Sequence, residues 1–331
     1  MDEAHEWTDR EIKNLAERIR YHYRKAAREL SAKTRKSLEQ HESANKDMRR
    51  RLRDGSIDQD EYSSWLARQN TIFASNRQLI DDLTESANNA TREARELIGD
   101  RMPDVYAENA NYAAFTIDRA ISRDTMFSLL DRDTVLDLMQ KDPKLLPVPE
   151  PNYAKGNRWH SQKFTSAIAQ GILQGESVDK IAKRVSLVAG MDYEASVRAA
   201  RTAMTCAENR GRLSSYKRAA SLGINGVKKW IATHDGRTRV SHRQLDGEEQ
   251  AVDAQFSNGL MEPGDADGRP EEVYNCRCSM KMVVNGASAD TLGKWSKLPP
   301  DVDYEDWKKG TYRTDRKGRE TKASRNARGA S

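Results

Sequence analysis

The stretch EIKNLAERIRYHYRKAAREL, residues 11–30, indicates the fold class, because its apolar residues recur three or four positions apart. That spacing places them on one face of a helix. No proline or glycine occurs from Trp7 to Arg53, so the pattern predicts one long helix over residues 7–53. The apolar face consists of Leu15, Ile19, Tyr23, Ala26 and Leu30.

A second helix is predicted directly after the first. Asp54 and Gly55 supply a turn, and Ser56 with Gln59 has the spacing of a capping box. Apolar residues then follow on one side of the predicted helix: Trp65, Ile72, Phe73, Leu79, Ile80 and Leu83. We therefore expect residues 1–141 to form a long helical hairpin or bundle in which these side chains belong to the core.

Residues 142–158 have the composition of a linker. Four prolines lie between Asp142 and Gly156, and this density disfavours regular helix and favours extended backbone. Three further helices are predicted beyond it, over residues 161–174, 177–188 and 192–222. The last of these has a stripe that we interpret as a solvated face. Its residues are Arg201, Thr205, Glu208, Asn209 and Arg212.

After Gly226 the pattern changes to that of strands and turns. Residues 227–233 and 279–284 are typical of strands, and five turn dipeptides ending in glycine lie between them. The predicted fold is therefore α+β and predominantly α-helical. It has a second module over residues 159–286 that contains a small, turn-rich α/β part, and a polar, basic flexible tail over residues 287–331 that we expect to end in a disordered basic segment.

The charge is concentrated at the C-terminal end. The chain carries a net charge of +5, whereas from Lys308 onward nine basic residues face two acidic ones. Such a tail either contacts a polyanion such as DNA or is simply solvated. The residues that would contact DNA are Lys308, Lys309, Arg313, Arg316, Lys317 and Arg319.

Membrane insertion and disulfide formation are not expected. No apolar run approaches the roughly 18 residues that span a bilayer, and the start, MDEAHEW, does not have the pattern of a signal peptide. Three cysteines are too few for a disulfide framework. These features predict a protein made in the cytoplasm.

Arginines and a histidine follow the turn at Asp235 and Gly236. Arg237 and Arg239 present two guanidiniums that could pair with carboxylates or phosphates, in the module itself or in a partner. His242 lies within one helical turn of Arg239, so the two would share a face.

Cys276 and Cys278 are candidate zinc ligands together with His242. On a strand, two residues one position apart point to the same side. A histidine and two thiols are suitable ligands for a structural zinc, with His234 or Asp235 as a fourth. The alternative is that the cysteines are small buried apolar residues, because the usual paired C-x2-C spacing is absent.

The ordered motifs of residues 230–278 resemble the phage Mu protein F-like head morphogenesis proteins, also called minor head or minor capsid proteins. The residues that carry the resemblance are Trp230, Asp235, Arg237, Thr238, Arg239, His242, Leu245, Asp246, Gly247, Phe256, Pro263, Pro270, Asn275, Cys276, Arg277 and Cys278. Upstream, Ala200, Arg201, Thr202 and Asn209 fit the helix that leads into this module. The clear resemblance covers residues 197–284.

The resemblance implies a structural role in the head of a tailed bacteriophage. Such a protein would be made in the host cytoplasm and enter the virion near the portal. It would contact the portal and the scaffold or major capsid protein, and assist genome packaging or ejection with non-specific contact to DNA. The resemblance also adds a suspected metal site at the His and Cys positions. Within the module, we expect Asp235, Arg237 and Arg239 to form internal ion pairs.

An enzyme is the alternative function. The Asp, Arg, His and Cys residues between 235 and 278 include a nucleophile, a general base and oxyanion stabilisers, as a DNA-processing or hydrolytic enzyme would need. However, no nucleophile elbow, P-loop, dinucleotide fingerprint or HExxH motif occurs in the sequence. We therefore predict a protein that is not an enzyme.

Overall fold

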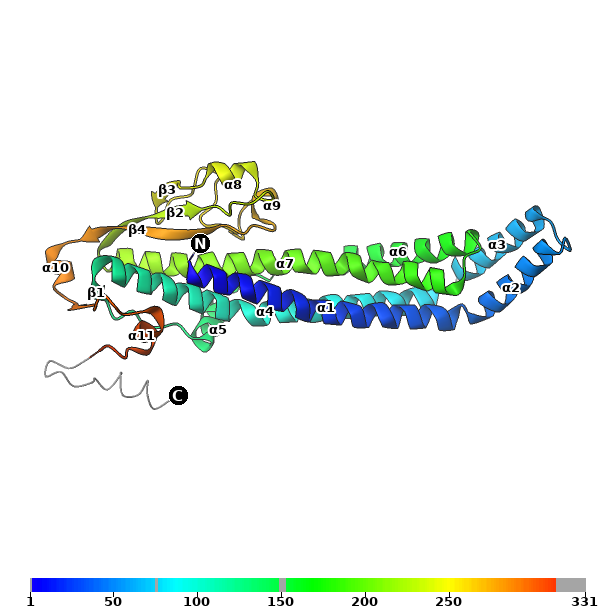
Figure 1. The fold of residues 1–331 in the computed structure, drawn as a ribbon, viewed down its shortest axis with the longest axis horizontal. Coiled ribbons are helices and arrows are strands. Elements are labelled where there is room, and N and C mark those ends of the chain that lie inside the picture. Colours follow the sequence, from blue (N-terminus) through cyan, green and yellow to red (C-terminus); the bar gives the residue numbers. More distant parts are fainter. Residues whose placement is uncertain (1, 75–76, 149–152, 314–331) are drawn as a thin grey trace. The chain divides into compact units, whose positions relative to one another are not determined.

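The computed structural model describes residues 2–74, 77–148 and 153–313, and these are predominantly helical (Figure 1). The helices are α1 (Glu3–Ser37), α2 (Glu39–Arg53), α3 (Gln59–Ala74), α4 (Arg77–Ile121), α5 (Arg132–Lys141), α6 (Tyr153–Leu173), α7 (Val178–Ser221), α8 (Val240–Gln244), α9 (Pro270–Val273), α10 (Ala289–Leu292) and α11 (Tyr304–Lys309). The strands are β1 (Arg123–Asp124), β2 (Ile224–Ile231), β3 (Glu249–Ala251), β4 (Ser279–Ala287) and β5 (Ser296–Lys297). The predicted fold class is confirmed.

The chain divides into two compact units. The sheet unit contains residues 2–13, 98–148 and 199–313, and the helical unit contains residues 14–74, 77–97 and 153–198. The helices α1, α4 and α7 contribute residues to both units. Each unit therefore joins segments that lie far apart in the sequence. A division of the chain into consecutive domains, such as residues 1–141 and 159–286, does not describe these units.

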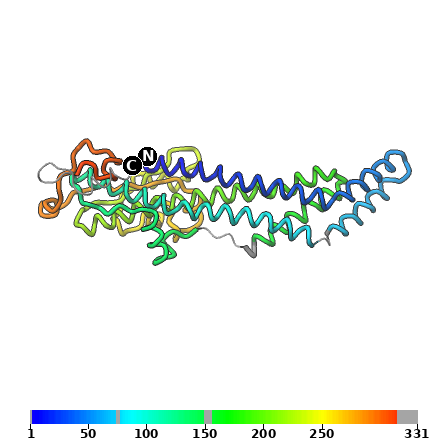
Figure 2. The backbone as a smooth tube through the Cα atoms, turned by 90° about the horizontal axis from the view of Figure 1, so that it is seen from below, coloured from blue at the N-terminus to red at the C-terminus, as the bar shows by residue number. Residues whose placement is uncertain are grey.

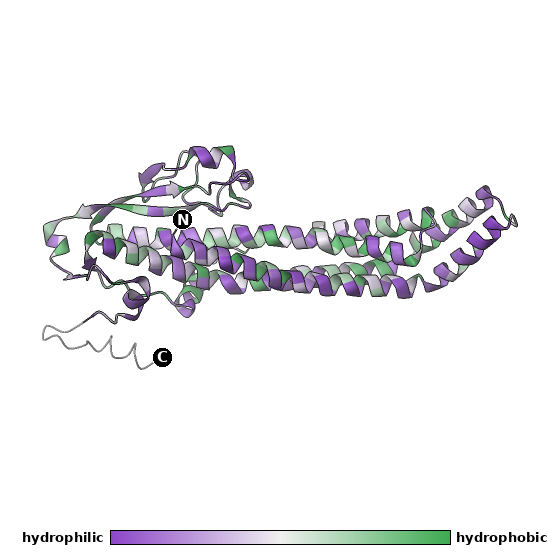
Figure 3. Ribbon diagram, viewed as in Figure 1, coloured by the Kyte–Doolittle hydropathy of each residue, from purple (hydrophilic) through white to green (hydrophobic). Residues whose placement is uncertain are grey.

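The helical unit buries the apolar face that the sequence predicts for α1. Leu15, Ile19, Tyr23, Ala26 and Leu30 are all 3% exposed or less. Figure 3 shows the hydrophobic residues of α1 alternating with hydrophilic ones along the helix, as expected for a helix with one buried face. Among the apolar residues predicted after Gly55, Leu83 is fully buried, whereas Ile72 is 59% exposed.

Several predicted helix boundaries are wrong. The helix expected over residues 7–53 is interrupted at Leu38, which is fully buried between α1 and α2. Conversely, the helices expected over residues 177–188 and 192–222 form one helix, α7, with Gly190 inside it. An exposed glycine costs a helix only about 1 kcal/mol, which does not end it. The capping box lies two residues later than predicted, since the Asp58 and Glu61 side chains accept each other's backbone N–H. The prolines Pro149 and Pro151 lie outside the described residues, and α6 already begins at Tyr153, within the predicted linker.

The sheet unit contains a three-stranded antiparallel sheet of order β3-β2-β4. Trp230 in β2 pairs with Met280 in β4, and Lys228 with Gln250 in β3. The predicted strands at 227–233 and 279–284 are therefore present, with small shifts of their ends. One face of β4 lies along the C-terminal part of α7, where the Tyr216 hydroxyl donates to the Met280 carbonyl over 3.1 Å (Figure 1).

The segment after Ala287, which we predict to be flexible, is folded as far as Arg313. Trp307 of α11 is 1% exposed, packs against Phe115 with 5.8 Å between ring centroids, and donates to Asp118 over 3.0 Å. Strand β5 pairs with β1. The prediction failed because the two buried aromatics of α11, Tyr304 and Trp307, lie in a mostly polar sequence whose apolar period is too short to detect.

Both chain ends that the structure describes belong to the sheet unit, and Figure 2 shows the start of α1 among its elements. None of the described helices combines the length and the apolar character that crossing a membrane requires.

Two glycines of α7 provide a matched test of helix packing. A Cβ added at Gly211 would lie 2.3 Å from the Tyr106 carbonyl oxygen of α4, whereas at Gly190 nothing lies within 4 Å. We expect Gly211→Ala to lower the free energy of unfolding by about 1–3 kcal/mol through overpacking. Gly190→Ala should raise it by about 0.5–1 kcal/mol through helix propensity. Urea denaturation followed by circular dichroism would measure both changes, and a Gly211→Ala protein as stable as the wild type would contradict the close helix contact.

Candidate functional site

The structure brings together the three residues that the sequence suggests as metal ligands. His242 lies on α8, while Cys276 and Cys278 lie just before β4. The three side chains are buried, and their potential ligand atoms all lie within 4.8 Å of one another. His242 Nδ1 lies 3.6 Å from the Cys276 sulfur and 3.5 Å from the Cys278 sulfur.

These distances match the edges of a tetrahedral zinc site. With Zn–S near 2.3 Å and Zn–N near 2.0 Å, a tetrahedral angle separates nitrogen from sulfur by about 3.5 Å. The other ring nitrogen of His242, Nε2, lies 3.0 Å from a carboxylate oxygen of Glu272. Such a carboxylate fixes the ring and its tautomer in metal sites, leaving Nδ1 as the ligand. The residues present therefore fit a zinc ion.

An apolar shell surrounds this cluster. The Trp230 ring meets the His242 ring edge-on at 5.2 Å and the Phe256 ring at 5.1 Å. Leu245, Leu260 and Val273 complete the same buried cluster. Trp230 Nε1 is buried and finds no acceptor among the residues the structure describes.

Neither predicted fourth ligand joins the cluster. His234 is 72% exposed, and its Nε2 lies 3.1 Å from Asp246. Asp235 is bound by both terminal nitrogens of Arg277, and this contact lowers the pKa of the Asp235 carboxyl far below its usual value. Within the described ranges the site thus offers three protein ligands.

The two thiols differ in acidity, because each is a hydrogen-bond partner of the other. The hydrogen bond from Cys276, together with one to His242, lowers the pKa of Cys278 to about 5, whereas the pKa of Cys276 is raised by its hydrogen bond with Cys278 and by burial. A thiolate is the form in which cysteine binds metals. Cys278 is therefore the first of the pair to be ready for a cation.

Helix α7 holds the loop that carries the two cysteines. The Thr205 hydroxyl donates to the Cys276 carbonyl over 2.8 Å, and the Asn209 amide donates to the Cys278 carbonyl over 3.2 Å. Arg212 continues the series by donating to the Met280 carbonyl over 3.1 Å. Three or four residues of a helix rise about 4.5–6 Å, and two residues of an extended strand span roughly 6.7 Å. Donors one turn apart on α7 can therefore reach every second carbonyl of the segment opposite.

The prediction that this stripe of α7 is solvated is therefore wrong for most of its members. Thr205, Glu208, Asn209 and Arg212 are all 2% exposed or less. The density of hydrogen-bonding groups in the stripe was the signal in the sequence. Its partners, backbone carbonyls about 70 residues away, could not be identified from the sequence.

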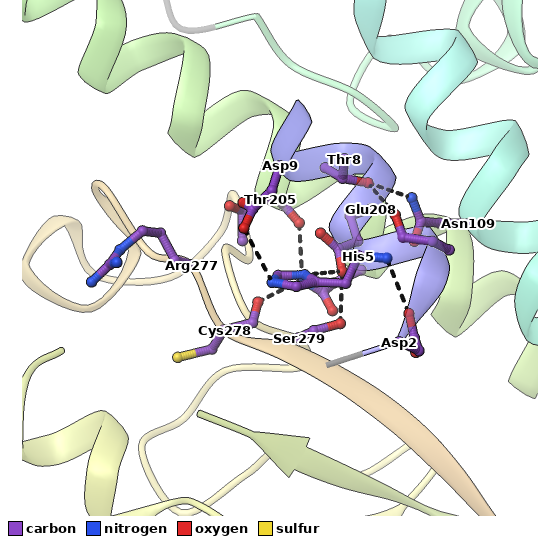
Figure 4. A network of polar contacts seen from close by, with 12 residues as sticks. Asp2, His5, Thr8, Asp9, Asn109, Thr205, Glu208, Arg277, Cys278 and Ser279 are labelled. Carbon is purple, nitrogen blue, oxygen red and sulfur yellow. Dashed lines mark hydrogen bonds and ion pairs between the residues drawn. The ribbon is translucent and has the colours of Figure 1, made fainter. Parts of the chain in front are cut away.

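A buried polar network adjoins the stripe, and the sequence analysis missed its N-terminal members (Figure 4). His5 Nδ1 lies 2.8 Å from Glu208, and the Ser279 hydroxyl donates to the same carboxylate oxygen over 2.7 Å. Asp2 accepts two hydrogen bonds of 2.7 Å from the Arg212 guanidinium. The Cys278 side chain points away from this network in Figure 4.

The remaining signature residues have structural contacts. Asp246 accepts the Ala232 backbone N–H over 2.8 Å. Asn275 has a positive φ of 60°, and its side chain accepts from Arg201 over 2.5 Å. Arg239 donates to the Tyr274 carbonyl.

Of the ion pairs expected among Asp235, Arg237 and Arg239, the structure shows only a long contact between Asp235 and Arg237 within the described residues. The partner of Asp235 is Arg277, whereas Arg237 lies 3.8 Å from the same carboxylate and is 81% exposed.

The basic tail is described only in part. Lys308 pairs with Glu108 at 2.6 Å and Arg313 with Asp124 at 2.7 Å, while Lys309 is 59% exposed. Arg316, Lys317 and Arg319 lie outside the described residues.

The fold and the site together define a helical protein whose C-terminal α/β module is built around a buried His-Cys-Cys cluster. Residues 162–281 match the family described as Phage Mu protein F like protein. The match covers 120 of the 331 residues and includes the motifs of residues 230–278, so this part of the chain is similar to the family that those motifs suggest.

Two curated relatives are similar to the chain. The minor head protein GP7 of Bacillus phage SPP1 is 28% identical over 195 residues, which cover 58% of this chain and 62% of that protein. An NAD(+)--arginine ADP-ribosyltransferase EFV of Enterococcus faecalis is 36% identical over 132 residues, which cover 39% of this chain but 27% of the transferase. The chain thus spans less than two thirds of either relative. No solved structure matches significantly.

The His5 contact predicts a pH-dependent stability. Burial lowers the pKa of His5, but the Glu208 carboxylate and its hydrogen bond outweigh this and raise it above the ordinary value. The stabilisation should be complete below the unfolded pKa of about 6.5 and be lost as the pH rises through the higher folded pKa. The stability difference between wild type and His5→Gln should therefore be largest below about pH 6.5 and shrink as the pH rises through the higher folded pKa of His5. Thermal denaturation at a series of pH values would test this, with the exposed His234→Gln as control; a difference that grows with pH would contradict it.

Proposed function

We propose that this chain is a minor head protein of a tailed bacteriophage that acts in capsid assembly and in genome packaging or ejection. The family match over residues 162–281 and the similarity to the SPP1 minor head protein support this role. The observation that carries the proposal is that most of the signature residues, with the exception of the exposed Arg237, make contacts within the module, because a module of this kind serves as a rigid unit. The partners would be the portal protein, the scaffold or major capsid protein, and DNA.

The location follows from the same role. The protein would be made in the host bacterial cytoplasm and reside in the virion, in the head interior or at the portal. Among the tail residues proposed to contact DNA, Lys308 and Arg313 have internal ion pairs shorter than 3 Å, whereas Lys309 lies 3.9 Å from Glu305 and is 59% exposed. A DNA contact by the tail would therefore rest on Lys309 and on the residues beyond Arg313.

A DNA-processing or hydrolytic enzyme is the less well supported alternative. Both ring nitrogens of His242 are engaged, by the thiols and by Glu272, and the ring is 1% exposed. Asp235 is held by Arg277. General acid–base catalysis needs a group that reaches the substrate, and these buried, paired groups do not offer one. The match to the ADP-ribosyltransferase covers 27% of that enzyme and gives no reason to place its activity in the shared region.

We further propose that His242, Cys276 and Cys278 hold a structural zinc ion. The tetrahedral spacing, the Glu272 contact and the apolar shell support this assignment. A bound zinc would link α8 to the loop before β4, across a turn-rich segment that has little apolar core of its own. The fourth position would be taken by a ligand other than His234 and Asp235.

Metal analysis tests the zinc proposal. Purified protein should contain about one zinc per chain by elemental mass spectrometry, and Cys276→Ser or Cys278→Ser should lose it and melt at a lower temperature. Cys206→Ser is the matched control, because Cys206 is also buried and free but lies outside the cluster. Stoichiometric zinc in Cys278→Ser, or metal-free wild type whose stability resists chelators, would overturn the assignment.

Virion composition tests the head-protein role. Quantitative mass spectrometry of purified particles should find the chain in few copies per head, and deleting its gene should lower the yield of infectious particles while the major capsid protein is still made. Complementation with the intact gene should restore the yield. Absence of the chain from both procapsids and virions, with normal infectivity of the deletion phage, would refute the role.

A further inference from the structure

Four arginines of the sheet unit gather on two loops and on the adjoining helix α7. Arg237 and Arg239 lie in the segment before α8, Arg277 lies just before β4, and Arg201 lies on α7. Hydrogen bonds tie three of the side chains to residues 235 and 274–275: Arg277 donates to the Asp235 carboxylate, Arg239 to the Tyr274 carbonyl and Arg201 to the Asn275 amide oxygen. We call these four residues the arginine cluster.

The carboxylates that face the cluster leave it with an excess of positive charge. Asp235 already accepts from Arg277, from the Arg237 backbone and from Thr238, so its oxygens are occupied. Asp9 is the second carboxylate whose charge acts on the cluster, and its side chain is 49% exposed. Four guanidiniums thus meet two carboxylates and the Cys278 sulfur, whose charge also acts on Arg277.

Two members of the cluster have guanidinium groups with spare donors. Arg237 is 81% exposed, and its nearest carboxylate oxygen is 3.8 Å away, beyond hydrogen-bond distance. Arg201 has one described side-chain contact, to Asn275. Partial burial together with Arg277 and Arg237 lowers the pKa of Arg201, as expected where like charges are crowded.

We infer that the arginine cluster is a binding site for the phosphodiester backbone of DNA, with Arg201 and Arg237 as its main contacts. This inference rests on the proposed role of the chain in handling the phage genome, and it places a DNA contact in the folded module in addition to the basic tail. An anion bound between the two arginines relieves their mutual repulsion and uses donors that the protein itself leaves free.

Phosphate suits this cluster better than a single carboxylate of a protein partner. A guanidinium fork binds phosphate through two parallel hydrogen bonds, and successive phosphates along a duplex can engage several arginines at once. The contact would carry no sequence preference, because it involves the backbone alone. The competing occupant is an acidic segment of another protein, for which the exposed Tyr274 would supply an apolar contact.

DNA titration of the full chain tests the site. Fluorescence anisotropy with a labelled duplex of about 20 base pairs, at several salt concentrations between about 50 and 200 mM, gives the affinity and its salt dependence. We expect Arg237→Ala to make the slope of log K against log salt shallower by about 1, and Arg201→Ala with Arg237→Ala by about 2. At about 100 mM salt the double variant should bind roughly tenfold more weakly or worse.

Matched variants separate charge, fold and tail. Arg269→Ala removes an arginine that is 70% exposed and paired with Glu271, and it should bind DNA like the wild type. Arg237→Lys keeps the charge and should keep the slope. A chain ending at Arg313 should retain the dependence on Arg237. Because Arg237 is largely exposed, its alanine variant should melt within a degree or two of the wild type.

Two results would overturn the inference. One is a double variant with wild-type affinity and slope. The other is a double variant that loses binding to a glutamate-rich peptide while its DNA binding is unchanged, which would assign the cluster to a protein partner. If the double variant binds DNA normally and the protein is still found in virions, this inference fails alone. If arginine-dependent DNA binding is found and the protein is absent from particles, the head-protein role fails instead.

Discussion

The series of hydrogen bonds from α7 to the backbone of residues 276–280 is the constraint on which the C-terminal module depends. Thr205, Asn209 and Arg212 donate in turn to the backbone carbonyls of Cys276, Cys278 and Met280, which are two residues apart in the segment that faces α7. These side chains and carbonyls are buried, so an unmatched member would leave a polar group without a partner, at a cost of about 1–3 kcal/mol each. The register of β4 against α7 is therefore strongly specified, and so are the positions of the two cysteines. A shift of one residue would break all three bonds together.

Arg212 connects this series to the rest of the sheet unit. Its guanidinium is 2% exposed and binds Asp2, Asn109 of α4 and the Met280 carbonyl. A buried charge is tolerated when it is paired and its donors are satisfied. The start of α1 is thus required in the sheet unit, because without Asp2 and His5 the side chains of Arg212 and Glu208 would lose charged partners while remaining buried. Removing one partner of such a pair typically costs several kcal/mol.

Features that depend on neighbouring residues in the sequence were mostly predicted correctly, whereas features that depend on distant residues mostly were not. The apolar face of α1 and the strand pair at β2 and β4 arise from short periods in the sequence, and both are present. The proximity of His242 to Cys276 and Cys278 could be suggested from residue chemistry, although its geometry depends on how the 33 residues between His242 and Cys276 fold. The burial of Glu208 and Arg212 and the folding of α11 depend on partners about 70 to 210 residues away, which no local pattern reveals.

The module contains two groups of polar residues. One group has the residue types of a reactive site, and the other remains available to a partner. The hydrogen bonds that each residue makes within the module distinguish the two groups. His242, Asp235 and the cysteines have their polar atoms engaged by neighbours within the module. Arg237 has the opposite character, since it is exposed and the carboxylate that lies 3.8 Å from it, that of Asp235, is already bound by Arg277. A residue whose hydrogen-bonding capacity is used internally stabilises the fold, whereas one whose capacity is left in solvent can act on another molecule. In the arginine cluster, the capacity left for other molecules is cationic, so the partners that this cluster selects should be anionic.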